Sequence, residues 1–365
     1  MARKTWQTKA DWQAGIAENL EITDTGVKLA RPEPAQFIRA SEAYKSDGTL
    51  VASGVPRYEG AGVRIEEGTS NLIPLAKQKF EGWMTYQGAV VTLTQNVAVP
   101  EWGATDATRI QTSGGTSVAK YLFNVGVVPA GELRAERVWV KNTGDKTVKV
   151  FANFSDIAAD VLPGESKLVK LENIIGNDVN NLQISFRTLT IADSLDFIAW
   201  RPQAETKTLA TSWTDGTRLP ESLSVPVLFD QEGEVEFDVN VTPMSKRQVA
   251  GETPRLITLT NSLDGNPGLM LHHAYDGASF GLQTRADDGQ LTSIWFNDTL
   301  LPNGLRHLRV LITIPAVILY CDGQPIARID NPELPSGWGR VYLLSSAAGT
   351  NQAGTTVGNL RMVVG

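Results

Sequence analysis

Residues 233–241 read GEVEFDVNV, and apolar and polar side chains alternate along the whole stretch. Val235 and Val241 belong to the apolar set, whereas Glu236, Asp238 and Asn240 belong to the polar set. Because successive side chains of a β-strand point to opposite faces, this alternation predicts a strand with one buried and one solvated face. Half-buried strands of this kind are typical of antiparallel sheets.

The same alternation recurs along most of the chain and is punctuated by turn signals. It appears in TVKVFANFS, LQISFRTLTI, LRVLITI and RVYLLSS, at residues 147–155, 182–191, 308–314 and 340–346. Asp-Gly pairs, which favour tight hairpin turns, stand at residues 47–48, 215–216, 264–265, 276–277, 288–289 and 322–323. The best helical candidate, ADWQAGIAENLEI at residues 10–22, is weakened by Gly15. The sequence therefore predicts an all-β protein with two antiparallel β-sandwich domains of the jelly-roll type.

Composition shifts divide the chain of 365 residues into four segments. Residues 1–66 are polar and lack long strand runs, so we expect an extended N-terminal arm or a small β subdomain. Residues 67–203 and 218–365 are strand-rich blocks of a size common for single sandwiches. Residues 204–217 are rich in turn-forming residues and are expected to connect the two blocks.

Charge and cysteine content limit the partners that this chain is expected to have. The formal net charge is -7, and the only basic cluster is Arg3-Lys4. A nucleic-acid partner is therefore not expected, because binding it requires many cations that neutralise phosphates. Cys321 is the single cysteine, so no intrachain disulfide can form, which suits folding in a reducing cytoplasm.

The N-terminal residues and the hydropathy pattern bear on targeting. The first residues, MARKTWQTKADWQ, contain no apolar core of a secretory signal. No apolar run approaches the roughly 20 residues that span a bilayer. We therefore expect synthesis in the cytoplasm without a signal peptide, and no membrane insertion.

The second strand-rich block contains GEVEFDVNV and, at residues 305–329, LRHLRVLITIPAVILYCDGQPIARI. These stretches resemble the concanavalin A-like, laminin-G-like sandwich superfamily, which often has two strands and then an Asp-Gly hairpin into a third. The matching residues are His307, Val310, Leu319, Tyr320, Asp322 and Gly323. Arg306 stands where the family usually has a tryptophan. The resemblance implies a sandwich with a hairpin at Asp322 and Gly323, and it leaves the function open because one fold hosts many roles.

The start and end of the first block carry a second resemblance. Residues 55–74 read VPRYEGAGVRIEEGTSNLIP, residues 196–205 read DFIAWRPQAE, and ATSWT and a Thr-Arg pair follow at residues 210–218. This order resembles tailed-bacteriophage virion proteins, in which a carbohydrate-binding-module-like jelly roll precedes a laminin-G-like domain. The matching residues are Pro56, Arg57, Tyr58, Glu66, Glu67, Asn71, Leu72, Trp200, Gln203, Glu205, Ser212 and Arg218.

The virion resemblance implies a non-enzymatic structural protein of the tail fibre or receptor-binding type. Residues 1–66 would attach it to other virion proteins of the capsid or tail, and the sandwiches would project towards a host surface glycan. An arm without its own core favours a homo-oligomer, with a trimer as the first expectation. A capsid decoration or head fibre protein, a glycan-active enzyme and a pure lectin module are the alternatives.

A glycan-active enzyme would need paired carboxylates that face a cleft. The visible pairs are Glu66 with Glu67, Glu234 with Glu236, and Asp287 with Asp288. Glu234 and Glu236 lie on the polar side of an alternating strand, which favours a solvated face. Asp287 begins an Asp-Asp-Gly turn. The sequence therefore predicts no catalytic residues.

Metal ligands are few in this sequence. The three histidines are His272, His273 and His307, and none of them has the spacing of a zinc site. His272 and His273 are adjacent in a strand, so they point to opposite faces. Glu67 and Asp196 are the candidate ligands of a structural calcium, and no other cofactor is expected.

Two loop tryptophans are the candidate glycan contacts. Trp102 lies in PEWGAT and Trp338 in PSGWGR, both of which are loops rich in glycine and proline. A flat ring that is exposed on a loop can stack on a sugar ring. The alternative for each is a place in a core or in a subunit interface.

Overall fold

A computed structural model gives the fold of the chain. It describes residues 5–11, 16–23, 26–29, 36–39, 41, 43–45, 49–59, 62–66, 68–127, 129, 132–152, 157–175, 181–207, 210–211, 213–214, 216–218, 221–227, 229, 231–242, 253–262, 265–274, 279–345 and 355–364. Two compact units are present. Unit 1 comprises Met1–Ser41, Val51–Gly68 and Leu219–Gly365, and unit 2 comprises Glu42–Leu50 and Thr69–Arg218.

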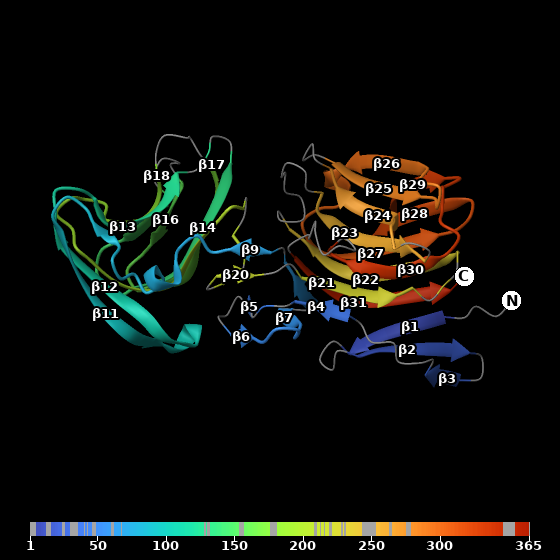
Figure 1. The fold of residues 1–365 in the computed structure, drawn as a ribbon, viewed down its shortest axis with the longest axis horizontal. Coiled ribbons are helices and arrows are strands. Elements are labelled where there is room, and N and C mark those ends of the chain that lie inside the picture. Colours follow the sequence, from blue (N-terminus) through green and yellow to red (C-terminus); the bar gives the residue numbers. More distant parts are fainter. Residues whose placement is uncertain are drawn as a thin grey trace. The chain divides into compact units, whose positions relative to one another are not determined.

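Unit 1 is a sandwich of two seven-stranded antiparallel sheets (Figure 1). Sheet 1 contains, in spatial order, β26 (Leu291–Asn297), β25 (Ser279–Arg285), β24 (Pro267–His273), β23 (Arg255–Asn261), β30 (Trp338–Leu343), β21 (Ser222–Pro226) and β4 (Gln36–Ile38). Sheet 2 contains β29 (Gln324–Asp330), β28 (Ala316–Cys321), β27 (Gly304–Ile312), β22 (Gly233–Val241), β31 (Thr355–Val364), β8 (Gly62–Ile65) and β7 (Arg57–Glu59). The all-β prediction is confirmed.

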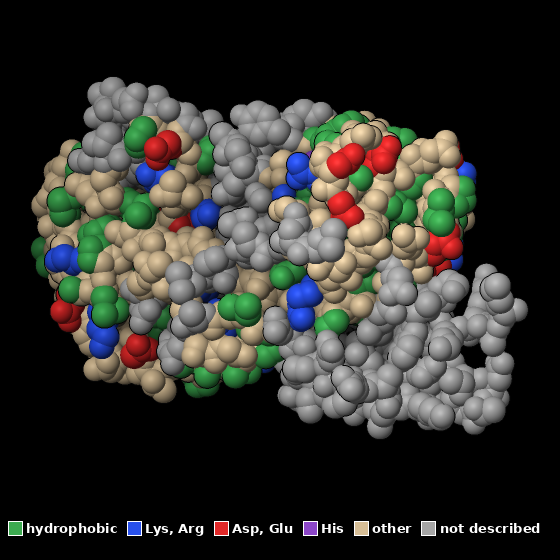
Figure 2. All heavy atoms as spheres, turned by 45° about the vertical axis from the view of Figure 1, so that its right-hand side comes forward, with side chains coloured by type: hydrophobic (Ala, Val, Ile, Leu, Met, Phe, Trp, Pro, Cys, Tyr) green, Lys and Arg blue, Asp and Glu red, His purple; other side chains and the backbone are tan. Residues whose placement is uncertain are grey.

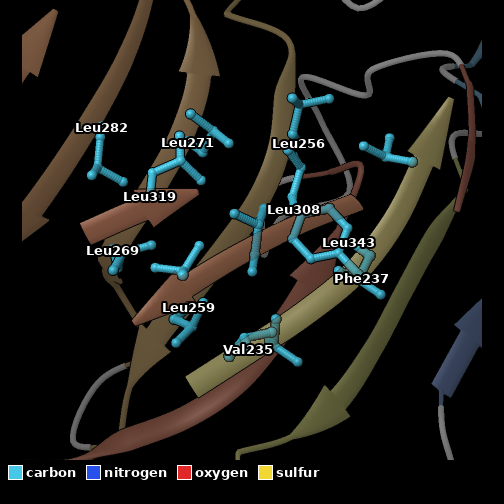
Figure 3. Packing of buried hydrophobic residues seen from close by; sticks show 14 of the residues in the cluster. Val235, Phe237, Leu256, Leu259, Leu269, Leu271, Leu282, Leu308, Leu319 and Leu343 are labelled. Atoms are coloured by element: carbon cyan, nitrogen blue, oxygen red, sulfur yellow. The ribbon is translucent and has the colours of Figure 1, made fainter. Parts of the chain in front are cut away.

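The hydrophobic core of unit 1 lies between sheets 1 and 2. Strand β22 buries every second residue, as its alternation predicts, and Val235 and Phe237 are completely buried. Figure 3 shows these side chains directed into the space that Leu259 and Leu343 also fill. Each fully buried side chain of this kind contributes about 1.5–3 kcal/mol to the stability of the fold.

Strands from the expected N-terminal arm are part of this sandwich. Strand β4 pairs with β21 at the edge of sheet 1, and β8 pairs with β31 in sheet 2. Val63 and Ile65 of β8 are completely buried in the core of unit 1. The boundary at residue 66 therefore differs from the structure. Composition could not reveal this, because these short strands pair with β21 and β31, which lie far along the sequence.

A buried cluster of charges fixes this N-terminal segment within unit 1. Arg57 Nη2 donates hydrogen bonds to Glu66 Oε2 at 2.9 Å and to Glu221 Oε2 at 2.8 Å. Arg39 Nη1 donates to Glu221 Oε1 at 3.2 Å. All four side chains are inaccessible to solvent. Since a buried charge without a partner is costly, these pairs tie Glu66 and Glu221 to one arrangement.

Unit 2 is a second sandwich, built from two five-stranded sheets. Sheet 3 contains β10 (Met84–Thr85), β13 (Ala119–Val127), β18 (Asn181–Arg187), β15 (Val148–Ala152) and β16 (Ile157–Val161). Sheet 4 contains β11 (Ala89–Val99), β12 (Ala104–Gly114), β19 (Leu195–Glu205), β14 (Leu133–Asn142) and β17 (Ser166–Ile175). Phe80, Phe186 and Phe197 are buried between the two sheets.

Polar groups hold the two ends of unit 2 together. β9 (Thr69–Ser70) pairs with β20 (Thr217–Arg218). The buried carboxylate of Glu205 accepts hydrogen bonds from Thr69 Oγ1 at 2.5 Å and from Thr211 Oγ1 at 2.8 Å. Asn71 Nδ2 donates to the carbonyl oxygens of Pro202 at 3.1 Å and Thr214 at 3.0 Å. Residues of the virion-like pattern thus have structural roles at the ends of this unit.

The remaining elements are short. The region suggested as a helix instead contains strand residues: β1 (Thr5–Asp11) and β2 (Ile16–Thr23) form an antiparallel sheet with β3 (Gly26–Leu29). β5 (Ala43–Tyr44) pairs with β6 (Leu50–Val51). Single turns of 3₁₀-helix are η1 (Leu75–Lys77), η2 (Pro100–Trp102) and η4 (Asp298–Leu300). Among the described residues, no helix has the length and apolar character required to cross a bilayer.

Candidate functional site: an aromatic and cationic face of sheet 1

Four directly paired residues form a row across sheet 1. They are Arg255 on β23, His272 on β24, Gly281 on β25 and Trp295 on β26. Residues that oppose one another in this way share a face of the sheet and lie in contact range. Leu271, the neighbour of His272, is completely buried in the core. The row therefore lies on the outer face of sheet 1.

The Trp295 ring lies flat on the sheet at Gly281. A Cβ atom added to Gly281 would lie 2.6 Å from Cζ3 of the indole and 2.9 Å from both Cε3 and Cη2, the two neighbours of Cζ3 in the ring. These nearly equal distances indicate that the face of the ring, not its edge, covers the glycine. Trp295 is nevertheless 48% exposed. The opposite face of the indole is therefore open as a flat apolar platform.

His272 supports one side of this platform. Its ring centroid lies 5.2 Å from that of Trp295, with the two planes at 87°. Burial lowers the pKa of His272, and the charge of Arg255 acts in the same direction, whereas hydrogen bonding to His273 and Gln283 opposes the shift. The imidazole is consequently neutral at pH 7 and can donate or accept a hydrogen bond.

Arg255 carries a positive charge that no described group neutralises. It is half-buried, and its Nε and Nη1 atoms are covered without a hydrogen-bond acceptor. Burial lowers the pKa of the guanidinium, which still remains protonated at neutral pH. A cation that has lost part of its hydration without gaining a partner attracts an anion strongly.

The next register step supplies groups for hydrogen bonding. Thr258, Met270, Gln283 and Ser293 pair across the same four strands. Met270, Gln283 and Ser293 lie two residues from the first row on their strands, so their side chains share its outer face. Thr258 is completely buried and donates a hydrogen bond to the carbonyl oxygen of Ser345 at 3.1 Å. Hydroxyl and amide groups here flank the aromatic platform, and Met270 adds an apolar contact. The face combines a ring for stacking with donors and acceptors beside it.

The rest of the surface carries charges of both signs. On the face drawn in Figure 2, the Lys and Arg side chains of the described residues are scattered and form no continuous basic stripe. On sheet 2, Arg309 pairs with Glu234 at 3.4 Å and His307 with Asp238 at 2.9 Å. Sheet 1 differs, because its cations lack such partners.

The two tryptophans that the sequence indicated as glycan contacts are buried, which corrects that expectation. Trp102 is 2% exposed and stacks on Trp200 with ring centroids 6.3 Å apart. Trp338 is 6% exposed, and its indole donates a hydrogen bond to the carbonyl of Gln231 at 3.1 Å. Gly-rich loops let these rings fold back onto a sheet, so they complete hydrophobic clusters. Neither ring has a free face for a sugar.

The candidate calcium ligands do not form a metal site in the described structure. Asp196 binds Arg109 through two hydrogen bonds of 2.8 and 2.6 Å and also accepts from Thr143. The hydrogen bond from Arg109 is the main cause that lowers the pKa of Asp196. Glu67 lies outside the described residues. Among those described, no three His, Cys, Asp or Glu side chains converge on one point.

The remaining predicted carboxylates are dispersed. Glu234 is paired with Arg309 on sheet 2, and Asp287 accepts a hydrogen bond from the amide of Ser336 at 3.0 Å. Asp287 and Asp288 also line a shallow pocket of about 520 Å³ beside Glu333. Glu66 belongs to the buried charge cluster. Among the described residues, the Asp287 and Asp288 pair is therefore the predicted pair that lines a pocket, and Glu66 and Glu234 do not line that pocket.

The Asp322 and Gly323 pair forms the turn between β28 and β29. Both residues have positive φ, 49° and 82°, and they join the paired residues Cys321 and Gln324. Positive φ at both central positions is the geometry of a type I′ hairpin, in which glycine is favoured. Asp322 also accepts a hydrogen bond from the amide of His307 at 2.9 Å. This pair is a structural element of sheet 2.

Sequence reasoning did not single out Trp295, although a signal was present. In the strand LTSIWFN, Trp295 shares its face with Ser293, whereas Phe296 lies on the buried face. A tryptophan on the polar side of an alternating edge strand is unusual. The glycine below it, Gly281, could be recognised only after the register of β25 and β26 was known.

Comparisons with known proteins describe a partial likeness to β-sandwiches. No protein-family model matches the sequence, and no curated protein matches it. Galectin LEC-6 of Caenorhabditis elegans is 12% identical with a TM-score of 0.30, over 39% of this chain and 89% of that one. The CBM40 domain of a Ruminococcus gnavus IT-sialidase, solved with α2,3-sialyllactose, is 16% identical with a TM-score of 0.28, over 37% and 75% of the two chains. Likeness at this level assigns no function.

Proposed function

We propose that this chain is a non-enzymatic adhesion protein whose outer face of sheet 1 binds a surface glycan. The observation that carries the proposal is the open indole of Trp295, held flat by Gly281 between the polar groups of neighbouring strands. A sugar ring has an apolar face and a rim of hydroxyls. The apolar face would stack on the indole, and His272 and Gln283 would form hydrogen bonds with the hydroxyls.

Three features of the site support binding without turnover. The strands of sheet 1 contain no carboxylate that could act as acid, base or nucleophile. Among the indicated carboxylates that the structure describes, Glu66 belongs to the buried charge cluster, Glu234 to an ion pair, and Asp287 and Asp288 to a turn. The platform is an open face rather than a deep cleft from which water is excluded.

The biological setting that we propose is the virion of a tailed bacteriophage. It rests on the sequence pattern at residues 55–74 and 196–218, in which Arg57, Asn71 and Glu205 match. The chain would attach to capsid or tail proteins through its N-terminal residues and would assemble as a homo-oligomer, for which a trimer is our first expectation. Antibody labelling of intact particles tests the location, and sedimentation of the purified chain tests the assembly.

Glycan binding is tested with a microarray of bacterial capsular and cell-wall polysaccharides. The unmodified chain is expected to bind a subset of these polysaccharides, and Trp295→Ala is expected to abolish the signal. Leu305→Ala is the matched control, because Leu305 is 62% exposed on sheet 2. It should bind like the unmodified chain. Absence of binding by the unmodified chain, or equal binding by Trp295→Ala, contradicts the proposal.

The non-enzymatic part has its own readout. Each polysaccharide that binds is incubated with the protein, and the formation of new chain ends is followed by size-exclusion chromatography. We expect the polymer length to stay constant over hours. Shortening of the polymer that disappears with a site variant would show that the face is catalytic.

A further inference from the structure

We propose that the glycan taken by sheet 1 is anionic, and that Arg255 binds its carboxylate or phosphate group while Trp295 stacks on the same or the adjoining sugar ring. This inference rests on the proposed function, and it adds the chemical class of the ligand. Both residues belong to the row of directly paired positions across β23, β24, β25 and β26.

The state of Arg255 is the first support. Its guanidinium makes no ion pair and no hydrogen bond within the described structure, and two of its nitrogen atoms are covered without acceptors. A half-buried guanidinium that only stabilised the fold would be expected to hold a carboxylate or carbonyl oxygen. Arg39 of the same unit shows that pattern, with donors to Glu221 and to the carbonyl oxygen of Ala52. Arg255 departs from this pattern and lies half-buried on the face that also carries the exposed Trp295.

The charge distribution of sheet 1 is the second support. The seven strands of this sheet contain Arg255, Arg285 and Arg340 and not one Asp or Glu. The chain as a whole has 40 acidic and 33 basic residues, so an entirely cationic sheet is not a consequence of composition. The three arginines have no carboxylate partner in the described structure, and Arg340 contacts Ser224. Their charges add on one face.

Sheet 2 provides the internal comparison. Its strands contain both signs, and cations there are matched on the strands themselves, as in Arg309 with Glu234 and Arg328 with Asp330. Asp288 lies in the turn after β25 and Asp298 in η4 after β26, not on the strands, and Glu252 and Asp276 lie outside the described residues. The face of sheet 1 is therefore the part of unit 1 that is suited to an anion.

The spacing of the strands determines how far a bound sugar must reach from Trp295 to Arg255. Arg255 and Trp295 are separated by two strands, each about 4.8 Å from the next, and the indole already extends over Gly281 towards His272. A sugar on the free face of the indole would bring a substituent of its ring, or of the next ring, within reach of the guanidinium. His272 and Gln283 lie between the two and would contact hydroxyl groups.

The experiment measures binding of defined oligosaccharides to the full chain by isothermal titration calorimetry. The probes are an oligogalacturonate, the same oligosaccharide after chemical reduction of its carboxyl groups, a phosphomannan fragment and its unphosphorylated counterpart. The variants are Arg255→Gln, Arg255→Lys and Trp295→Ala. The matched control is Arg328→Gln, which changes the net charge equally on sheet 2.

We expect the chain to prefer at least one anionic probe over its neutral counterpart by tenfold or more. Arg255→Gln should remove that preference while it leaves the weaker binding of the neutral probe unchanged. Arg255→Lys should restore part of the preference, and Arg328→Gln should behave like the unmodified chain. The carboxylate and phosphate arms identify which anion is the ligand.

Three outcomes would overturn the inference, and they are distinguishable from one another. If anionic and neutral probes bind equally and Trp295→Ala abolishes both, the glycan-binding face stands and its preference for anions is wrong. If Arg255→Gln weakens both members of a pair to the same degree, Arg255 only maintains the face. If no probe of the set or of the microarray binds, the proposed function and this inference fall together.

Discussion

Gly281 and Trp295 form a pair whose geometry makes a specific prediction. Gly281 does not have positive φ, so alanine fits its backbone, but the added Cβ would meet the indole at 2.6 Å. The ring must therefore lift from the sheet in Gly281→Ala. We expect about a tenfold loss of glycan affinity, with the unfolding free energy changed by about 1 kcal/mol.

A double-mutant cycle provides the control for this pair. In the Trp295→Ala background the steric conflict is absent, so adding Gly281→Ala should have no further effect on affinity or stability. Affinities from calorimetry and unfolding free energies from urea titration give both readouts. An equal effect of Gly281→Ala in both backgrounds would show that the glycine acts on the sheet and not through the ring.

Glu136 gives a residue-scale prediction in unit 2. It pairs with Leu171 and Ala204 of the core, is completely buried, and its carboxyl oxygens have no hydrogen-bond partner in the described structure. Burial raises the pKa of Glu136 to about 8. The folded state therefore keeps the proton up to this pH, whereas the unfolded state loses it near the usual pKa of 4.5.

The sign of the pH dependence follows from this difference. The contribution of Glu136 is fully present below about pH 4.5, is lost progressively as the pH rises to about 8, and is constant above that value. Glu136→Gln imitates the protonated acid at every pH. Urea unfolding should show similar stability at pH 5 and a gain on the order of a few kcal/mol for the variant at pH 8. Glu101→Gln, at an exposed pair, is the control and should show no such gain.

At the residue scale, the sequence predicted which face of a strand a side chain occupies. It did not predict equally well whether that side chain is accessible to solvent. The opposite orientations of His272 and His273 are confirmed, because one contacts Trp295 and the other contacts Phe280 of the core. Trp102 and Trp338 could not be judged correctly, since loop composition does not tell whether a loop folds back on its sheet. The platform of Trp295 depends on strand register, which is a long-range property.

At the element scale, the connection between β8 and β21 depends on the buried charges. Glu221 accepts hydrogen bonds from Arg39, from Arg57 and from the backbone amide of Glu66. Glu221→Ala would remove an acidic partner from two buried guanidinium groups, those of Arg39 and Arg57. We expect a loss of about 3–5 kcal/mol in the unfolding free energy.

An exposed ion pair of the same unit is the control for the Glu221 variant. Arg328 and Asp330 are both more than half exposed, so Asp330→Ala should cost about 0–1 kcal/mol. Urea unfolding of both variants, followed by far-UV circular dichroism, makes the comparison. A loss for Glu221→Ala no larger than that for Asp330→Ala would show that the cluster does not stabilise unit 1.

How well a strand could be predicted depended on how far away in the sequence its paired strand lies. Local signals were sufficient for β22, with its strict alternation, and for the hairpin at Asp322 and Gly323. They failed for β4 and β8, which are short and pair with strands far along the sequence, β21 and β31. A pattern shows that a strand exists, but the partner is chosen by packing and by buried charges.

At the scale of the whole molecule, residues 69–218, which make up most of unit 2, are an insertion within the sequence of unit 1, and this arrangement predicts that the inserted segment and unit 1 each fold alone. The amide of Glu221 donates to the carbonyl oxygen of Glu66 at 3.0 Å, so the two ends of the gap in unit 1 are adjacent. In unit 2, Thr69 pairs with Arg218. Adjacent ends are what allow one domain to be inserted into another.

The prediction is tested with two shortened chains. One contains residues 69–218 alone, and the other replaces residues 69–218 with a short Gly-Ser linker. Each should give a single cooperative unfolding transition, and the linked unit 1 should retain the glycan affinity of the full chain. A linked unit 1 that binds no glycan, although it folds, would mean that the binding face requires unit 2.

Nuclear magnetic resonance of the indole N–H groups tests the central claim most directly, because it locates the glycan on the molecule. The chain has nine tryptophans, and the signal of Trp295 is assigned by its loss in Trp295→Phe. During titration with a polysaccharide fragment that binds, the Trp295 signal should shift progressively while those of buried Trp102 and Trp338 stay in place. A titration in which the Trp295 signal does not move, although the fragment binds, would contradict the assignment of the site to sheet 1.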